Sequence, residues 1–193
     1  QGKDFDCAGF SVGVVDADKV LSAQRVSEGD VIVGIASSGF HSNGFSLLRK
    51  VFAPDLAKWK DELMRPTQLY VKLIHSLLSV YDIKAMAHIT GGGIGNLTRV
   101  LPVGVNAELV PWKIPSIFIE VWKRAKCSTH DLLTTLNCGI GFALVLPAEQ
   151  AQNCIDACEK KGVKAFHLGR IVANSKQPPQ WTLDLDELER QNL

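Results

Sequence analysis

Apolar residues recur along the chain with two different spacings, and each spacing predicts one kind of element. Short β-branched runs bounded by glycine or polar residues predict buried strands at residues 8–15, 31–36, 85–89, 103–109, 137–146 and 166–172, with an edge strand at 181–185. Apolar residues three and four positions apart predict helices at residues 45–52, 66–80, 96–101, 115–126, 130–136 and 147–161. The two kinds of element therefore follow one another along the whole chain.

The order of these elements indicates the fold class. Strands and helices alternate unevenly, which favours an α/β fold with a mixed β-sheet flanked by helices over a barrel. A length of 193 residues suffices for one domain with a sizeable core, so we expect a single domain over residues 1–193. The acidic end, residues 183–193, is expected to be a solvated tail. A strand-like run soon after Gln1 suggests a domain cut from a longer protein.

A polar loop joins the strand predicted at 31–36 to the helix predicted at 45–52. Ser42 or Asn43 is expected to cap that helix. Unpaired amides and the helix dipole attract anions at a helix start, so the loop predicts a phosphate-binding site. An ordinary strand-to-helix turn is the alternative, because the loop matches neither the Walker pattern nor GxGxxG. The loop residues that can meet a ligand are Ser37, Ser38, Gly39, His41, Ser42, Asn43, Gly44 and Ser46.

A second strand-loop-helix unit carries Thr90, Gly91, Gly92 and Gly93. Three consecutive glycines suit a sharp bend or the close approach of backbone to a ligand. His88 precedes them and is either an imidazole that reaches a ligand or a structural histidine. Further on, Gly139 and Gly141 remove side chains from one face of the strand predicted at 137–146, which suits close packing or a nearby ligand.

Composition and charge narrow the partners. The formal charge is +1, from 21 basic and 20 acidic residues, so nothing in the overall charge favours nucleic acid or an anionic membrane. No apolar run approaches the roughly 18–20 residues that cross a bilayer. Five scattered cysteines, an odd number, favour a reducing, cytoplasmic setting. Cys154 and Cys158 are expected in the core. The sequence contains no CxxC pair, so the cysteines do not predict a metal site.

Acidic residues contribute little candidate chemistry. Asp131, near Asn137, is the acid most suited to a functional role. A triad of Ser42, His41 and Asp131 lacks a nucleophile elbow, which disfavours a hydrolase.

Read together, these segments resemble the C-terminal half of aminoimidazole ribonucleotide synthetase, also called phosphoribosylformylglycinamidine cyclo-ligase. The resemblance is densest in the loop around His41, Ser42, Asn43 and Gly44, and it covers nearly the whole chain in the order of the family. It is carried by residues 8–15, 34–51, 66–72, 87–93, 99–102 and 137–141.

The resemblance implies a three-layer α/β sandwich and a step of purine biosynthesis. ATP would phosphorylate the formamide oxygen of formylglycinamidine ribonucleotide, an amidine nitrogen would close the imidazole ring, and ADP and phosphate would leave. Phosphate is a better leaving group than a bare oxygen, and a nitrogen held beside the activated carbon reacts faster. The family uses ATP with Mg²⁺. Its N-terminal ATP-binding domain is absent from this chain, and its members pair as homodimers.

The resemblance also assigns residues to the site. It places His41 and His88 in the catalytic region, with no general base assigned. Ser37, Ser38, Gly39, Ser42, Asn43, Gly44 and Ser46 would contact a phosphate or the substrate. Thr90, Gly91, Gly92 and Gly93 would form the facing wall, with Asn137 and Gly139 nearby.

The chain departs from the family pattern at several charged positions. After the triple glycine it reads Ile94, Gly95, Asn96, one residue shorter than the family and without its Glu. Gln68 replaces a frequent Arg. These departures leave open a divergent or non-catalytic member, or a related ATP-using enzyme of the formylglycinamidine ribonucleotide synthetase, selenophosphate synthetase or thiamine-phosphate kinase type.

Overall fold

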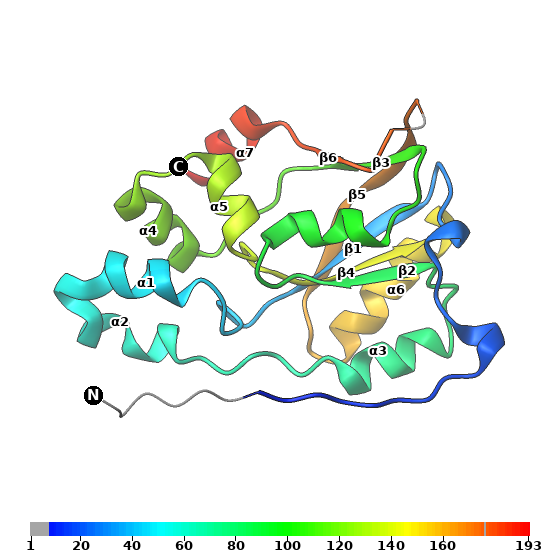
Figure 1. Cartoon of the computed structure of the whole chain (residues 1–193), viewed down its shortest axis with the longest axis horizontal. Helices are drawn as coiled ribbons and strands as arrows, with labels where there is room; N and C mark the ends of the chain where they lie inside the picture. Colours follow the sequence, from blue (N-terminus) through cyan, green and yellow to red (C-terminus); the bar gives the residue numbers. More distant parts are fainter. Residues whose placement is uncertain (1–7, 176) are drawn as a thin grey trace.

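A computed structural model describes residues 8–175 and 177–193. The described residues form one six-stranded sheet in the order β2-β4-β1-β5-β3-β6 (Figure 1). Neighbouring strands are antiparallel except β3 and β6, which are parallel, so the sheet is mixed as predicted. The strands are β1 (Val31–Ala36), β2 (Ala85–His88), β3 (Val105–Leu109), β4 (Ile140–Leu146), β5 (Ala165–Ala173) and β6 (Trp181–Thr182).

Helices cover both faces of the sheet (Figure 1). The α-helices are α1 (Phe45–Phe52), α2 (Leu56–Leu63), α3 (Val71–Leu78), α4 (Ser116–Ala125), α5 (Thr129–Thr135), α6 (Ala148–Lys160) and α7 (Leu185–Asn192). Short 3₁₀ turns are η1 (Ala17–Lys19), η2 (Ala23–Arg25), η3 (Ala53–Asp55) and η4 (Gly93–Val100). Within residues 8–175 and 177–193, no helix combines the length and apolarity that crossing a membrane requires.

The alternation of side chains along each strand divides the core into two parts. In β1, Ile32 packs with side chains of η4, α1, α4, α5 and α7, whereas Val33 and Ile35 pack with α3 and α6. The other long central strand, β4, does the same, with Val145 on the first face and Leu144 on the second. Helices, sheet and helices therefore form three layers, which confirms the predicted fold class.

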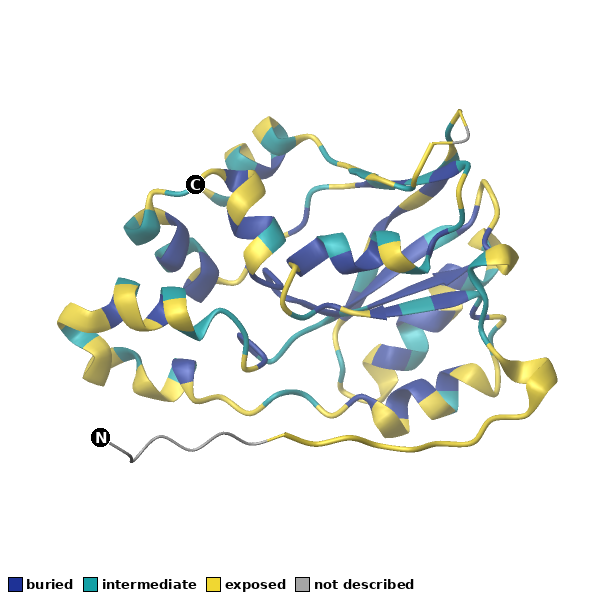
Figure 2. Cartoon of the chain, viewed as in Figure 1, coloured by how far each residue is buried: buried dark blue, intermediate teal, exposed yellow. Residues whose placement is uncertain are grey.

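The predicted strand at residues 8–15 is wrong. The described segment is extended but pairs with no strand, and Phe10, Val12 and Val14 are 98–100% exposed (Figure 2). Its alternating pattern is that of a strand, yet a strand needs a neighbouring backbone to complete its hydrogen bonds. The described part of the chain supplies no such neighbour.

The predicted solvated tail is also wrong. Residues 185–192 form α7, and Leu188 is completely buried. The Asp184 side chain caps the helix by accepting a hydrogen bond from the Glu187 amide at 2.9 Å. Near the other end, the Asn192 amide group accepts from Ile114 N at 2.8 Å and donates to Trp112 O at 3.0 Å. The acidic composition hid one apolar position that anchors the helix.

Other differences concern the bounds of elements. The helix predicted from residue 66 begins at Val71, and residues 66–70 form no regular element; the Gln68 amide donates to His41 Nε2 in the first polar loop. Helix α2 was not predicted. The edge strand predicted at 181–185 is reduced to two residues, Trp181 and Thr182. Cys154 and Cys158 are fully buried in α6, which confirms their placement in the core.

Candidate functional site

The loop of residues 37–46 leaves β1 through a tight turn. The Asn43 amide donates to Phe40 O at 3.1 Å, and the two central residues, His41 and Ser42, have φ values of 51° and 59°. Left-handed backbone costs a side-chain-bearing residue about 1–2 kcal/mol, and here two occur in succession. The loop is therefore held in a conformation that its surroundings must enforce.

The predicted cap of α1 is wrong. Gly44, with a φ of 73°, occupies the N-cap position, and no side chain caps the helix. Instead, the Asn43 side chain donates to His41 O at 2.7 Å, and the Ser42 hydroxyl lies 3.5 Å from the Thr67 hydroxyl. Ser46 lies exposed in the first turn of α1. The first amides of the helix are thus left without a side-chain partner.

His41 holds the loop together from inside. Its Nε2 accepts hydrogen bonds from the backbone amides of Ser38 at 3.0 Å and Gln68 at 3.4 Å. Only 3% of His41 is exposed, and its Nδ1 is buried without a hydrogen-bond partner among the described residues. Such an unsatisfied polar group costs about 1–3 kcal/mol. Burial, and secondarily the nearby His88, lowers the pKa of His41 to about 4.

Four rings, His41, Tyr70, His88 and Phe142, form what we call the aromatic cluster. The His41 and His88 rings are 6.2 Å apart, Tyr70 lies 6.0 Å from the first and 6.1 Å from the second, and His88 stacks on Phe142 at 5.4 Å. The Tyr70 hydroxyl donates to Ala36 O at 2.7 Å. Burial raises the pKa of Tyr70 and lowers that of the more exposed His88.

Gly141 makes room for the aromatic cluster. It sits in the irregularity where β1 shifts register on β4, and a Cβ at this position would overlap the Tyr70 hydroxyl and lie 2.9 Å from His41 Cε1. The prediction that glycines clear one face of this strand finds its physical reason here.

The three glycines of the second loop have three different environments. A Cβ on Gly91 would lie 3.2 Å from the Asn43 side-chain oxygen, so this is where the two loops meet. Gly92 has a φ of 103° and lies against Asn96, whose buried Oδ1 has no partner among the described residues. Gly93 packs so closely on the last carbonyls of α5 that no side chain fits. The loop is thus wedged between Asn43 and α5.

Asn137 ties the first loop to the start of β4. Its amide group donates to Gly39 O at 2.8 Å, and its oxygen accepts from the Ser37 hydroxyl at 3.0 Å and from Gly139 N at 2.9 Å. The Ser37 amide also donates to Gly139 O at 2.9 Å. Because Asn137 is buried, its hydrogen bonds fix the first loop from the interior of the protein.

The structure therefore brings most of the sequence-predicted site residues together. His41 lies beside His88, Asn43 beside Gly91, and Asn137 bonds Ser37, Gly39 and Gly139. Thr90 is bonded by Asn96 at 3.4 Å. Asp131, in contrast, has its carboxylate bonded to Ser128 at the start of α5, where it completes a helix cap.

The first loop also lines a cavity of about 270 Å³ that sequence reasoning missed. Ser37, Ser38 and Gly39 form one side of it, and the start of α4 with Trp59, Glu62 and Arg65 forms the other. Arg65 bonds Glu62 at 2.7 Å. The apolar residues of α2, at helical spacing, were the signal that could have identified this wall.

Helix α2 is held in place by charge. Arg124 of α4 makes two hydrogen bonds to the Asp55 carboxylate, at 2.6 and 2.9 Å, and Trp59 donates to the same carboxylate at 3.0 Å. The Arg124 guanidinium also lies over the rings of Phe52 and Trp59. Bonding to Arg124 lowers the pKa of Asp55 to about 2. The cavity wall is thus fixed to α4.

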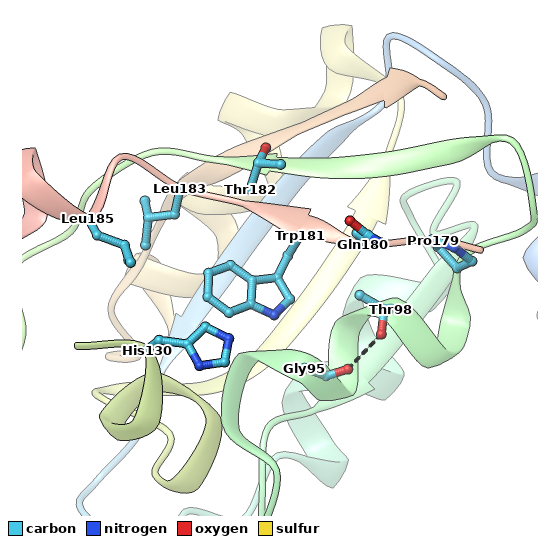
Figure 3. A pocket seen from close by; sticks show the side chains of 9 residues that line it. All are labelled: Gly95, Thr98, His130, Pro179, Gln180, Trp181, Thr182, Leu183 and Leu185. Carbon is cyan, nitrogen blue, oxygen red and sulfur yellow. Dashed lines mark hydrogen bonds between the residues drawn. The ribbon is translucent and has the colours of Figure 1, made fainter. Parts of the chain in front are cut away.

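A larger cavity, of about 520 Å³, is lined by residues outside the two loops (Figure 3). It is bordered by η4, by the start of α5 and by the segment of β6, and the His130 ring stacks on Trp181 at 5.5 Å. None of its lining residues was predicted as a site residue. Among the described residues, no three His, Cys, Asp or Glu side chains are grouped so that they could bind a metal ion.

Comparison with known protein families shows which family shares these loops. A family profile described as "AIR synthase related protein, C-terminal domain" matches residues 27–181. The chain belongs to this family. The matched residues of this AIR synthase-related domain include both loops and Asn137.

Two curated relatives of the AIR synthase-related domain carry the same name. A protein named phosphoribosylformylglycinamidine cyclo-ligase from Rippkaea orientalis is 40% identical over 185 residues, covering 88% of this chain and 54% of the relative. A protein of the same name from Parasynechococcus marenigrum is 42% identical over 188 residues, covering 90% of this chain and 55% of the relative. The domain therefore spans about half the length of these relatives.

Solved structures share the fold of the AIR synthase-related domain. The thiamine-monophosphate kinase of Stenotrophomonas maltophilia superposes with a TM-score of 0.59 at 17% identity, covering 86% of this chain and 54% of that one. At this identity the likeness concerns the fold alone.

Proposed function

We propose that this domain is the C-terminal part of an ATP-dependent cyclo-ligase that converts formylglycinamidine ribonucleotide to aminoimidazole ribonucleotide. The observation that carries the proposal is the 40–42% identity, over about nine-tenths of the chain, to two proteins named phosphoribosylformylglycinamidine cyclo-ligase. The residues that the resemblance assigns to the site also lie close together: the His41 loop meets the glycine loop at Asn43 and Gly91.

The loops suit an anionic ligand. Helix α1 has no side-chain cap, so its first amides are free to donate to a phosphate. The hydroxyls of Ser42 and Ser46 are exposed next to them. Neither loop contains an acidic residue that would repel a phosphate. We assign this end of α1 to a phosphate of the substrate or of ATP.

ATP fits these donors, whereas Mg²⁺ does not find a dedicated site in the described residues. Magnesium prefers carboxylate and water oxygens, and no suitable group of acidic side chains exists in the described part of the chain. Mg²⁺ would neutralise charge on the ATP phosphates when bound, held by residues outside this domain.

We propose that the domain works joined to a second structural unit, an N-terminal ATP-binding domain, in a homodimeric cytoplasmic enzyme. The exposed strand-like segment supports this, because Phe10, Val12 and Val14 lie on one side of an extended backbone and would bury that side as part of another sheet. The relatives' length, about twice that covered by this chain, allows for such a unit. Free thiols at Cys127, Cys138, Cys154 and Cys158 suit a reducing compartment.

The test is an assay for ATP-dependent ring closure by the full-length parent, which is this domain joined to the proposed N-terminal domain. We expect formation of aminoimidazole ribonucleotide together with ADP and phosphate, and we expect the isolated domain to be inactive. A folded parent without turnover would refute the catalytic proposal. Titration of formylglycinamidine ribonucleotide by calorimetry, into the parent and into its His41→Ala variant, would then separate a binding protein from a scaffold, because a scaffold has no binding to lose.

A further inference from the structure

The two histidines of the aromatic cluster have opposite surroundings. His41 is almost fully buried, and the amides of Ser38 and Gln68 both point at its Nε2. His88 is exposed, and its ring nitrogens form no hydrogen bond with the described residues. His41 comes from the first loop and His88 from the end of β2, just before the second loop, so the two rings meet from different elements and in different environments.

The hydrogen-bond partners of His41 determine which nitrogen carries its hydrogen. A backbone amide is always a donor, so the nitrogen that faces two amides must offer a lone pair. The Ser38 hydroxyl, 3.1 Å from the same Nε2, does not compete, because it donates its hydrogen to Pro66 O at 2.7 Å. The neutral ring must therefore carry its hydrogen on Nδ1.

The same contacts keep His41 uncharged. A protonated ring would place an Nε2 hydrogen against both amide hydrogens, in a site closed to water. The lowered pKa of His41 agrees with this arrangement. The titratable groups that face the ring are His88 and Tyr70, and the Tyr70 hydroxyl is already committed to Ala36 O. Among the described residues, no carboxylate contributes to the pKa shift of either histidine, so none of them would stabilise a charged His41.

We propose that His41 is a positioning residue, fixed as the neutral Nδ1–H ring, and that His88 is the proton acceptor of the pair. This assignment rests on the proposed cyclo-ligase function. In the ring closure, the attacking nitrogen forms its bond to the activated carbon, its proton passes to a neutral ring nitrogen of His88, and the carbon–oxygen bond breaks as phosphate leaves with the electron pair. His41 acts through the loop that its Nε2 holds.

The first test measures the rings themselves, without any assay of turnover. Long-range ¹⁵N–¹H spectra of the histidine side chains distinguish the two neutral tautomers and follow protonation with pH. We expect His41 to show hydrogen on Nδ1 and to stay neutral down to about pH 5, and His88 to titrate at higher pH. Signals are assigned with His41→Gln and His88→Gln variants. A His41 signal with hydrogen on Nε2, or protonation of His41 near pH 6.5, overturns the proposal.

The second test separates positioning from proton transfer in the full-length parent. His41→Gln places an amide oxygen where Nε2 accepts, so we expect it to retain the wild-type pH dependence of kcat, whereas His41→Leu loses the acceptor and most activity. His88→Gln should lower kcat at least tenfold and remove the acidic limb of the profile. His75→Gln, an exposed position on α3, is the matched control.

The outcomes distinguish the two proposals. If His41→Gln removes the acidic limb while His88→Gln keeps it, the division of roles is reversed and the inference fails. If the parent closes no ring at all, the proposed function fails, and the tautomer spectra still decide the state of His41.

Discussion

Replacing Asn137 by alanine should destabilise the protein more than any other single amide deletion near the loops. The side chain is buried and bonds three groups, of which two are backbone: Gly39 O at 2.8 Å and Gly139 N at 2.9 Å. The third partner, the Ser37 hydroxyl, can rotate toward another acceptor, so its loss matters less.

The magnitude follows from the two backbone groups. Each buried donor or acceptor left without a partner costs about 1–3 kcal/mol, so Asn137→Ala should lower the free energy of unfolding by about 2–6 kcal/mol. A typical domain has about 5–15 kcal/mol in total, so this one substitution should remove a large share of the stability.

Urea unfolding followed by circular dichroism measures this free energy. Asn153→Ala, at an exposed position of α6 whose side chain bonds nothing in the described residues, is the control and should change stability by less than about 0.5 kcal/mol. A loss below about 1 kcal/mol for Asn137→Ala, with an unchanged dependence on urea, would show that the loop does not depend on these bonds.

Three further perturbations test other parts of the structure. Gly141→Ala should cost about 1–3 kcal/mol in urea unfolding because the new methyl group meets the aromatic cluster, whereas Gly95→Ala, with open space around it, should be neutral or slightly stabilising; equal effects would refute the packing argument. The pKa of His41 is about 4 in the folded protein, against a usual value of 6.5, so between those pH values only the unfolded chain takes up this proton. The free energy of unfolding should therefore fall by at most about 3 kcal/mol as the pH falls from 6.5 to 4. The His41→Gln variant should lack this part of the pH dependence. Leu188→Ala should cost about 2–5 kcal/mol in the same measurement and Leu69→Ala, which is 84% exposed, almost nothing; a neutral Leu188→Ala would restore the solvated-tail interpretation.

The local pattern of apolar residues was sufficient to predict an element whose own regularly spaced side chains form part of the core. The β-branched run of β1 and the apolar stripe of α4 predicted their elements to within one residue at each end. The pattern failed where the structure of a segment depends on contacts with another segment. Residues 8–15 alternate as a strand does, but in the described chain they pair with no strand. In α7, one fully buried leucine, Leu188, on an acidic helix was too weak a signal.

The candidate site shows the same division. The small, polar and glycine residues of the two loops marked where backbone and ligand could approach closely, and the structure brings those loops into contact. The participation of Tyr70 and Phe142 could not be predicted, because it depends on the register of β4 against β1 and on the space above Gly141. The fixed tautomer of His41 depends on the amide of Gln68, which is distant in the sequence.

The position of β1 within the sheet has a consequence for how the chain acquires its structure during synthesis. Its two neighbours, β4 and β5, follow it by about a hundred residues or more, so β1 emerges from the ribosome long before either partner exists. Contacts between such distant segments form slowly, because a long loop must close first. The centre of the sheet can therefore be completed only after residue 173 has been made, and until then β1 has an unpaired backbone edge, flanked by apolar side chains, with which another chain could pair.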